Sequence, residues 1–212
     1  MGKPVMITSF VDANLMADHS TGRSQTGILH LFNKTPIDWF SKAQTSVETA
    51  TYGSEFVAAR ICVDQVIDLR NTLRYLGVPL AIVNGNDASF MFGDNMSVVN
   101  SSVLPSGKLQ KRAHLLNYHR VREAQAVGTV KFVHMDGKEN PADIMTKARS
   151  SREWFPLMKP LLFWRKLTDT PIGIITEGSE SRSAESAMPP LEEPGVLQQS
   201  SRLPLAQVIG YQ

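Results

Sequence analysis

Four acidic residues stand where the chain leaves an apolar segment or where a helix is expected to begin. They are Asp12, Glu55, Asp94 and Asp143. Asp94 is the clearest case, because it ends the run MFGD and is followed at once by an amide and the apolar stretch SVV. A charge inside a core is costly unless it is paired or holds a metal. Asp94 is therefore expected to have partners elsewhere in the chain, and the other three carboxylates are the candidates.

The chemistry of such a group follows from its residue types. Four carboxylates in one crevice would repel each other strongly unless divalent cations neutralised them. Oxygen ligands select hard ions, which predicts two Mg²⁺ ions, with Mn²⁺ as the alternative. Two such ions about 4 Å apart promote in-line attack on phosphorus, because one activates a water and the other stabilises the leaving 3′ oxygen.

Each carboxylate also has an ordinary structural explanation when it is taken alone. Asp94 could cap the helix that follows it, and Asp12 could be a turn residue. Glu55 and Asp143 could simply favour a helix N-terminus. The metal-site hypothesis therefore depends on the four residues together, in the order of the elements that carry them.

The hydrophobic pattern predicts the elements that must position these residues. Three short apolar and β-branched segments indicate an antiparallel meander whose first strand ends at Asp12. These segments are residues 5–13, 27–32 and 37–41. From about Tyr52 the apolar spacing changes to three and four residues, which predicts a long amphipathic helix that carries Glu55 and stops at Gly77.

The next part of the chain alternates strands and helices. The expected order is a strand that ends at Asp94, a short helix, a helix over residues 111–127, a strand over residues 129–135 and a final helix from Pro141. This order predicts an α/β fold with a mixed five-stranded sheet flanked by helices. Right-handed crossovers would place the strands that end at Asp12 and Asp94 side by side.

Composition limits the class of protein and divides the chain. The 212 residues are 42% hydrophobic and 20% charged, which suits one packed domain, expected over residues 1–150. Residues 151–176 are an apolar extension interrupted by prolines, and residues 177–212 are predicted to be a disordered tail. The single cysteine, Cys62, excludes an internal disulfide and a zinc site built from several thiolates. No apolar run has the length of a membrane span or of a signal-peptide core, which predicts an intracellular protein, cytoplasmic or nuclear, that does not contact a membrane.

Six blocks of the sequence occur in an order and spacing that resemble a known family. They are VDANLMAD, GRSQTGILHLFNKTPIDWFSKAQTSV, SEFVAAR, MFGDNMSVVNS, KRAHLLNYHRVREA and VKFVHMDGKENPADIMTK, within residues 8–148. Together they resemble the ribonuclease H domain of copia-type LTR retrotransposon polyproteins. The resemblance implies a ribonuclease H-like fold, cleavage of the RNA strand of RNA–DNA hybrids in reverse transcription, and a reverse transcriptase domain of the parent polyprotein as a partner. It also implies that the family's four acidic positions fall on Asp12, Glu55, Asp94 and Asp143.

The sequence departs from the family pattern at three places. Asn14 stands where the family usually has a second Asp, and Gly53 stands where a second Glu is common. His114 is shifted by one place, whereas His119 and the residues after it match. His134 is the nearest candidate for a histidine that aids proton transfer, although its position in an expected strand is equally consistent with a structural role.

Two groups of residues are expected to contact nucleic acid. The first group precedes the long helix or follows Asp94 and could bind phosphates or the 2′-hydroxyls that distinguish a hybrid from duplex DNA. It consists of Ser41, Lys42, Gln44 and Asn95. The second group lies on the basic segment 111–123 and could follow the phosphates of the other strand or form an ordinary solvated helix face. It consists of Lys111, Arg112, His119 and Arg122.

The leading functional hypothesis is a metal-dependent endonuclease that cleaves the RNA of an RNA–DNA hybrid. A second hypothesis is a catalytically silent remnant that keeps the fold and acts as a nucleic-acid-binding or connection module. A third is a different nuclease on the same fold, such as a resolvase or an integrase. The order of the acidic residues, with Glu55 on the first helix, favours the first hypothesis over the third.

Overall fold

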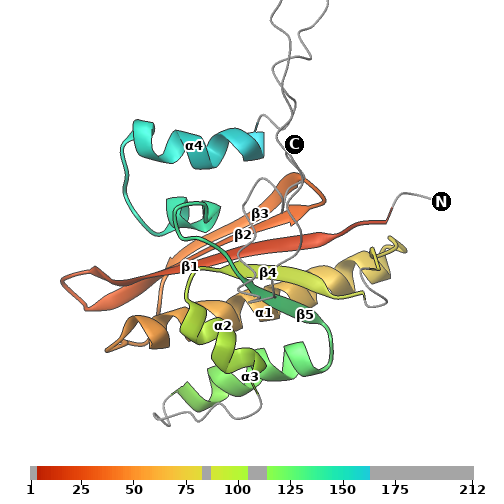
Figure 1. Cartoon of the computed structure of the whole chain (residues 1–212), viewed down its shortest axis with the longest axis horizontal. Helices are drawn as coiled ribbons and strands as arrows, with labels where there is room; N and C mark the ends of the chain where they lie inside the picture. Colours follow the sequence, from red (N-terminus) through yellow and green to blue (C-terminus); the bar gives the residue numbers. More distant parts are fainter. Residues whose placement is uncertain (1–3, 83–86, 105–113, 163–212) are drawn as a thin grey trace, which may run out of the picture. The chain divides into compact units, whose positions relative to one another are not determined.

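A mixed sheet of five strands organises the molecule (Figure 1). The computed structural model describes residues 4–82, 87–104 and 114–162. The strands are β1 (Ile7–Asp18), β2 (Arg23–Phe32), β3 (Thr35–Ala43), β4 (Ser89–Gly93) and β5 (Val130–His134). Their order in the sheet is β3-β2-β1-β4-β5, with antiparallel pairing among the first three strands and parallel pairing of β1 with β4 and of β4 with β5. The expected meander and the expected neighbourhood of β1 and β4 are confirmed.

Helices cover both faces of this sheet. They are α1 (Thr51–Tyr75), α2 (Met96–Val103), α3 (Leu115–Ala126), the 3₁₀-helix η2 (Pro141–Met145) and α4 (Ser151–Leu162). Adjacent residues of β1 point to opposite faces and enter separate cores, since side chains alternate along a strand. Val11 packs with residues of α1 and α3, whereas Phe10 packs with Leu161 of α4. Figure 1 shows α1 and α3 on one side of the sheet and α4 on the other.

The long helix forms where the apolar spacing predicts it. Phe56, Ala59, Val63 and Val66 are buried and recur every three or four residues along α1. The chain leaves the helix at Gly77, whose φ of +69° is readily adopted only by glycine. Among the described helices, none has the length and hydropathy needed to cross a membrane.

Four elements differ from the sequence-based expectation. The first strand, expected to end at Asp12, continues to Asp18 because its pairing with β2 extends past Asp12, so Asp12 lies inside β1. Residues 23–26, expected in a turn, continue β2, because the β1–β2 hairpin turns earlier, over residues 19–22. The expected helix from Pro141 is only a five-residue 3₁₀-helix. Residues 151–162, expected to be interrupted by prolines, form the helix α4 with both prolines inside it.

The position of α4 bears on the expected domain boundary. Leu157 and Leu161 are buried, and Leu161 belongs to the core on the η2 side of the sheet. We therefore propose that the domain extends to the end of α4 rather than stopping at residue 150. The rest of the apolar extension and the predicted disordered tail, residues 163–212, lie outside the described residues.

Candidate metal centre

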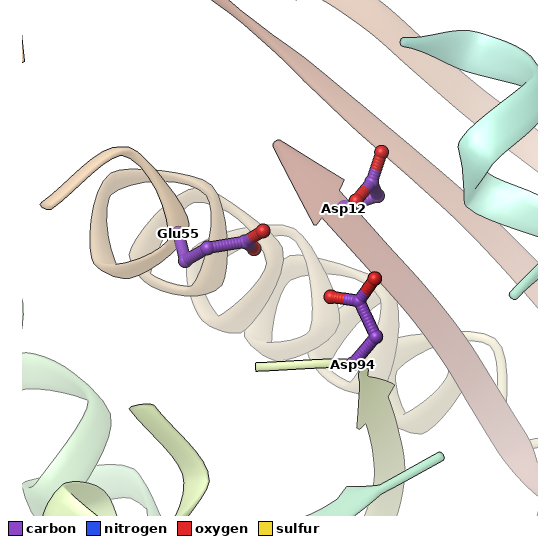
Figure 2. Close-up of side chains that lie close together, drawn as sticks. All are labelled: Asp12, Glu55 and Asp94. Carbon is purple, nitrogen blue, oxygen red and sulfur yellow. The ribbon is translucent and has the colours of Figure 1, made fainter. Parts of the chain in front are cut away.

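Three carboxylates from three separate elements meet at one point. Asp12 lies in the central strand β1, Glu55 on the second turn of α1, and Asp94 directly after β4. One carboxylate oxygen from each lies within 4.8 Å of the others. Figure 2 shows the three side chains turned towards a common space. The side chains of Asp12 and Glu55 are buried, and that of Asp94 is half-buried.

The surroundings of Asp94 show that it is not a helix cap. Asn95 caps α2, because its Oδ1 accepts hydrogen bonds from the backbone N–H groups of Ser97 (3.1 Å) and Val98 (3.3 Å). His134 Nε2 donates to the backbone carbonyl of Asp94 at 2.9 Å, so this histidine contacts the backbone of Asp94. A Cβ at Gly137 would stand 2.7 Å from Asp94 Oδ2. A larger residue at position 137 would therefore require the Asp94 carboxylate to shift.

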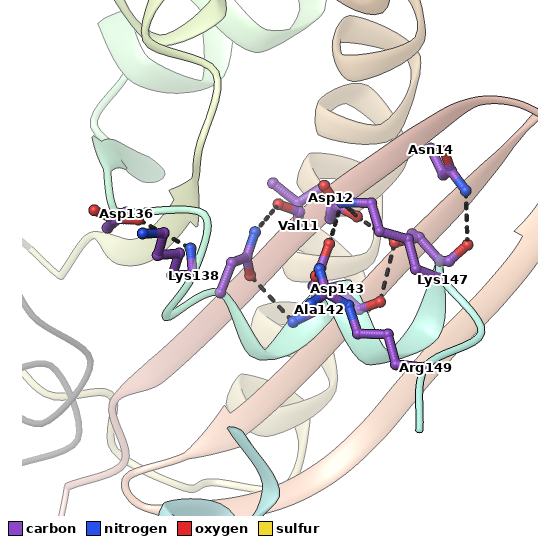
Figure 3. A network of polar contacts seen from close by, with 11 residues as sticks. Val11, Asp12, Asn14, Asp136, Lys138, Ala142, Asp143, Lys147 and Arg149 are labelled. Carbon is purple, nitrogen blue, oxygen red and sulfur yellow. Dashed lines mark hydrogen bonds and ion pairs between the residues drawn. The ribbon is translucent and has the colours of Figure 1, made fainter. Parts of the chain in front are cut away.

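The fourth carboxylate, Asp143, lies beside this group but is directed to other partners. Asn140 anchors η2, since its Nδ2 donates to the carbonyl of Val11 (2.9 Å) and its Oδ1 accepts from the N–H of Ala142 (3.1 Å). Asp143 is buried, and its two carboxylate oxygens pair with Lys147 and Arg149 (Figure 3). The expected convergence is thus observed for three residues, and the fourth is held by two neighbouring cations.

Polar contacts tie the end of η2 to β1. The Thr146 hydroxyl donates to the Asp12 carboxylate, and Lys147 Nζ lies 3.8 Å from Asp12 Oδ2. Asn14 Nδ2 donates to the carbonyl of Thr146 at 3.2 Å. Asn14, where the family usually has Asp, therefore acts as a donor, which a carboxylate could not do.

Burial makes the charged forms of these carboxylates costly. It raises the pKa of Asp12 to about 6, with Asp94 adding repulsion and Thr146 and Lys147 opposing the rise. Burial, and then repulsion from Asp12 and Asp94, raises the pKa of Glu55 well above its usual value. Burial also raises the pKa of Asp94. The group therefore favours neutralisation, either by protons or by a bound cation.

The residues present fit a hard divalent cation. Three carboxylates supply an all-oxygen donor set of the kind that Mg²⁺ and Mn²⁺ prefer. A cavity of about 490 Å³ adjoins them, and its lining includes the three carboxylates together with Asn14, Asn95 and Lys147. The carboxylates are therefore open to a ligand that enters this cavity.

The first group of expected nucleic-acid contacts divides into exposed and buried residues. Ser41 and Lys42 are exposed near the end of β3, and the Ser41 hydroxyl donates to the carbonyl of Met145 at 2.6 Å. Asn95 is half-buried, with its Oδ1 engaged in the cap of α2. Gln44 is buried, and its amide nitrogen donates to Thr26 Oγ1 and to the carbonyl of Ser54.

The second group is described only in part. His119 is exposed on α3. Arg122 donates to the carbonyls of Ser101 and Leu104 and to the hydroxyl of Tyr118, so it links α3 to the end of α2. Lys111 and Arg112 lie outside the described residues.

Sequence reasoning missed the two cations next to Asp143. Lys147 stands four residues after Asp143. In a helix this spacing places two side chains on the same side, so it could have predicted the pair. Arg149 follows the end of η2, and its contact depends on the path of the chain after the helix.

Comparison with known proteins supports the fold and gives a distant relative. No family model matches the chain. Over 161 residues, 76% of this chain, the sequence is 27% identical to the retrovirus-related Pol polyprotein from transposon TNT 1-94 of Nicotiana tabacum, and it spans 12% of that polyprotein's length.

Solved structures supply the second comparison. LC11-RNase H1, isolated from compost by a metagenomic approach, superposes with a TM-score of 0.50 at 15% identity, over 66% of this chain and 92% of that one. The N-terminal RNase H domain of rv2228c from Mycobacterium tuberculosis gives a TM-score of 0.49 at 12% identity, over 73% and 97%. The chain therefore has the ribonuclease H fold and is similar in sequence to one segment of a retrovirus-related Pol polyprotein.

Proposed function

We propose that the chain is the ribonuclease H domain of a copia-type retrotransposon polyprotein and cleaves the RNA strand of RNA–DNA hybrids. The observation that carries this proposal is the convergence of Asp12, Glu55 and Asp94 from three separate elements of a ribonuclease H fold. A buried group of this kind has no structural use as a set of free acids, because each ionised member destabilises the others.

Asp12, Glu55 and Asp94 would hold Mg²⁺ or Mn²⁺, with Asp143 as the fourth ligand. Bound divalent cations supply Lewis-acid activation of a phosphodiester and of the attacking water. The chain's own residues prepare the ligands. Thr146 holds the Asp12 carboxylate by a hydrogen bond, and the loop at Gly137 limits the space of Asp94.

Two exposed residues near the site are consistent with the proposed substrate class. Ser41 and Lys42 present a hydroxyl and a cation near the end of β3, and Ser41 contacts the carbonyl of Met145 in η2. Such groups can contact a phosphate backbone and the 2′-hydroxyls of an RNA strand. The similarity to a Pol polyprotein supports a role in reverse transcription, with the reverse transcriptase domain of the parent polyprotein as a partner.

A non-catalytic nucleic-acid-binding module is the second candidate. One observation favours it, namely that both carboxylate oxygens of Asp143 are already paired with Lys147 and Arg149. If these ion pairs persist when nucleic acid binds, the site lacks its fourth ligand and the chain binds a hybrid without cutting it.

Cleavage of a labelled RNA–DNA hybrid in Mg²⁺ distinguishes these functions. We expect the wild type to cut the RNA strand, Asp94→Asn to lose the activity, and Asp136→Asn, which alters an exposed acid on the nearby loop, to retain it. Binding without cutting by the wild type would support the non-catalytic module. Equal cutting of duplex DNA would support a different nuclease on the same fold.

A further inference from the structure

Lys147 occupies a special position at the candidate metal centre. Its ammonium group pairs with Asp143 Oδ1 and lies 3.8 Å from Asp12 Oδ2 (Figure 3). It also lines the cavity beside Asp12, Glu55 and Asp94. Lys147 is therefore a cation placed among the carboxylates that are proposed to bind metal.

Arg149 makes a different contribution. It pairs with Asp143 Oδ2, and it is not among the residues that line the described cavity. Its guanidinium is a planar group suited to fixing a carboxylate from one side. Lys147 instead carries a compact charge on a flexible stem. The two side chains are about equally exposed, at 37% for Lys147 and 35% for Arg149, so Lys147 is set apart by its place in the cavity.

We propose that Lys147 is a built-in competitor of the second divalent cation at this centre. This inference rests on the proposed function, because it assumes that the carboxylates bind metal. In the metal-free protein, the Lys147 ammonium partly neutralises Asp12 and Asp143. Asp143 would become available as a ligand only after Lys147 withdraws from it, so Lys147 would weaken binding of a cation that uses Asp143 as a ligand.

The Lys147 side chain can leave Asp143 without a movement of the backbone. Asp143 and Lys147 are four residues apart, and the backbone N–H of Lys147 donates to the carbonyl of Asp143 at 3.1 Å. The side chain can therefore leave and return while the backbone keeps its hydrogen bond. Thr146 holds Asp12 in place during the exchange through its hydroxyl.

Calorimetric titration of the full chain with Mn²⁺, without nucleic acid, tests the proposal. Lys147→Met removes the charge and keeps the length of the side chain, Lys147→Arg keeps a charge, and Lys138→Met removes a charge from an exposed position on the preceding loop. We expect Lys147→Met to bind the second Mn²⁺ roughly tenfold more tightly than the wild type, because a charge at this distance couples strongly to an incoming ion. Lys138→Met should bind like the wild type.

A thermal melt without metal separates competition from a merely structural role. We expect Lys147→Met to melt at a lower temperature than the wild type in EDTA, since a counter-charge is lost, and to gain more than the wild type from added Mn²⁺. A variant that melts lower but binds Mn²⁺ no more tightly would overturn the proposal.

The same titration distinguishes failure of the inference from failure of the proposed function. Equal affinities in the wild type and Lys147→Met, with hybrid cleavage retained, would refute the role of Lys147 and leave the nuclease intact. Binding of Mn²⁺ by Lys147→Met alone would support the inference strongly. Absence of Mn²⁺ binding in every variant would overturn both.

Discussion

Burial gives the three converging carboxylates properties that surface acids do not have. Asp12 and Glu55 are 1% and 5% exposed, so their charged forms lose hydration that the protein replaces only in part. The sequence indicated that these residues belong together, because each was expected at the end of a strand or the start of a helix; Asp94 and Glu55 lie there, whereas Asp12 lies within β1. It could not show that Asp143 would be paired with two cations, since that depends on the orientation of side chains around η2.

The raised pKa values predict how stability changes with pH in the absence of metal. The folded protein keeps a proton on Asp12 up to about pH 6, whereas an unfolded chain loses it near 3.8. Between these values the folded state binds more protons, so the free energy of unfolding contributed by Asp12 falls as pH rises, by about 2 kcal/mol. Urea denaturation in EDTA at several pH values between 4 and 8 measures this fall.

Asp12→Asn is the control for that measurement, because its amide does not ionise. His30, whose pKa burial lowers, contributes a slope of opposite sign in both proteins and cancels in the comparison. We expect the stability of the wild type relative to Asp12→Asn to decrease as pH rises and to recover when Mg²⁺ is added. If the difference in the free energy of unfolding between the wild type and Asp12→Asn stays constant across this pH range, burial does not raise the pKa of Asp12.

Asn14 gives a second prediction at the residue scale. Asn14→Asp restores the residue usual in the resembled family but replaces the donor to the Thr146 carbonyl with an acceptor. We expect the free energy of unfolding to fall by about 1–2 kcal/mol, because two oxygens then face each other. Asn71→Asp, an exposed change on α1, should alter it by less than about 0.5 kcal/mol. Urea denaturation of the wild type and both variants measures these changes in the free energy of unfolding. Equal values for the two variants would contradict the role of Asn14 as a donor.

At the scale of the element, the apolar spacing predicted the long helix α1. It did not predict how other side chains pack against the N-terminal end of that helix. The Nδ1 of His114 lies 3.5 Å from Glu48 Oε2, and both side chains pack against Gly53. A Cβ at residue 53 would stand 2.6 Å from Cε1 of the buried His114 ring. The glycine that departs from the family pattern therefore makes room for a shifted histidine.

Gly53→Glu tests whether this packing outweighs the usual benefit of an acidic residue in the first turn of a helix. An acid in the first turn normally stabilises a helix, so helix propensity alone would make Gly53→Glu neutral or slightly stabilising. We expect Gly53→Glu to lower the free energy of unfolding by about 1–3 kcal/mol, because the new side chain meets the His114 ring and the Glu48 carboxylate. Thermal denaturation of Gly53→Glu beside the wild type measures this loss, and equal stability of the two proteins would show that the space at residue 53 is not needed.

The helix α4 shows why a propensity argument can miss an element. Pro156 and Pro160 each remove a backbone donor, so the sequence predicts an interrupted segment. Leu157 and Leu161 nevertheless lie four residues apart on one face and are buried. Burial against a sheet face that would otherwise be exposed stabilises the helix despite the prolines.

Two adjacent leucines test the packing of α4. Leu161 is 5% exposed in the core that contains Phe10, whereas Leu162 is 56% exposed. We expect Leu161→Ala to lower the free energy of unfolding by about 2–4 kcal/mol and Leu162→Ala by less than about 0.5 kcal/mol. Denaturation in guanidinium chloride measures both, and a small effect of Leu161→Ala would mean that α4 does not complete the core.

At the scale of the whole molecule, the candidate site joins the two ends of the ribonuclease H-like sequence. Asn140 contacts Val11, and Thr146 contacts Asp12, across 129 and 134 residues of chain. The order of strands and the right-handed crossovers predicted that β1 and β4 would be neighbours. The sequence could not predict how η2 docks on β1, because that contact depends on a few polar side chains rather than on a periodic pattern.

Asn140 is the residue through which the fold and the metal centre should be coupled. It is fully buried, caps η2 and donates to the Val11 carbonyl, so Asn140→Ala leaves an acceptor unpaired and removes a cap. We expect the free energy of unfolding to fall by about 2–4 kcal/mol and Mn²⁺ affinity to fall as well, because η2 no longer holds Asp143 and Thr146 beside Asp12.

Leu161→Ala is the control, because it loosens the same face of the sheet without changing the polar contacts of η2. This variant should lose stability but bind Mn²⁺ normally. Urea denaturation and metal titration of the two variants give the comparison, and a parallel loss of metal affinity in both would show that general loosening, rather than the position of η2, controls the site.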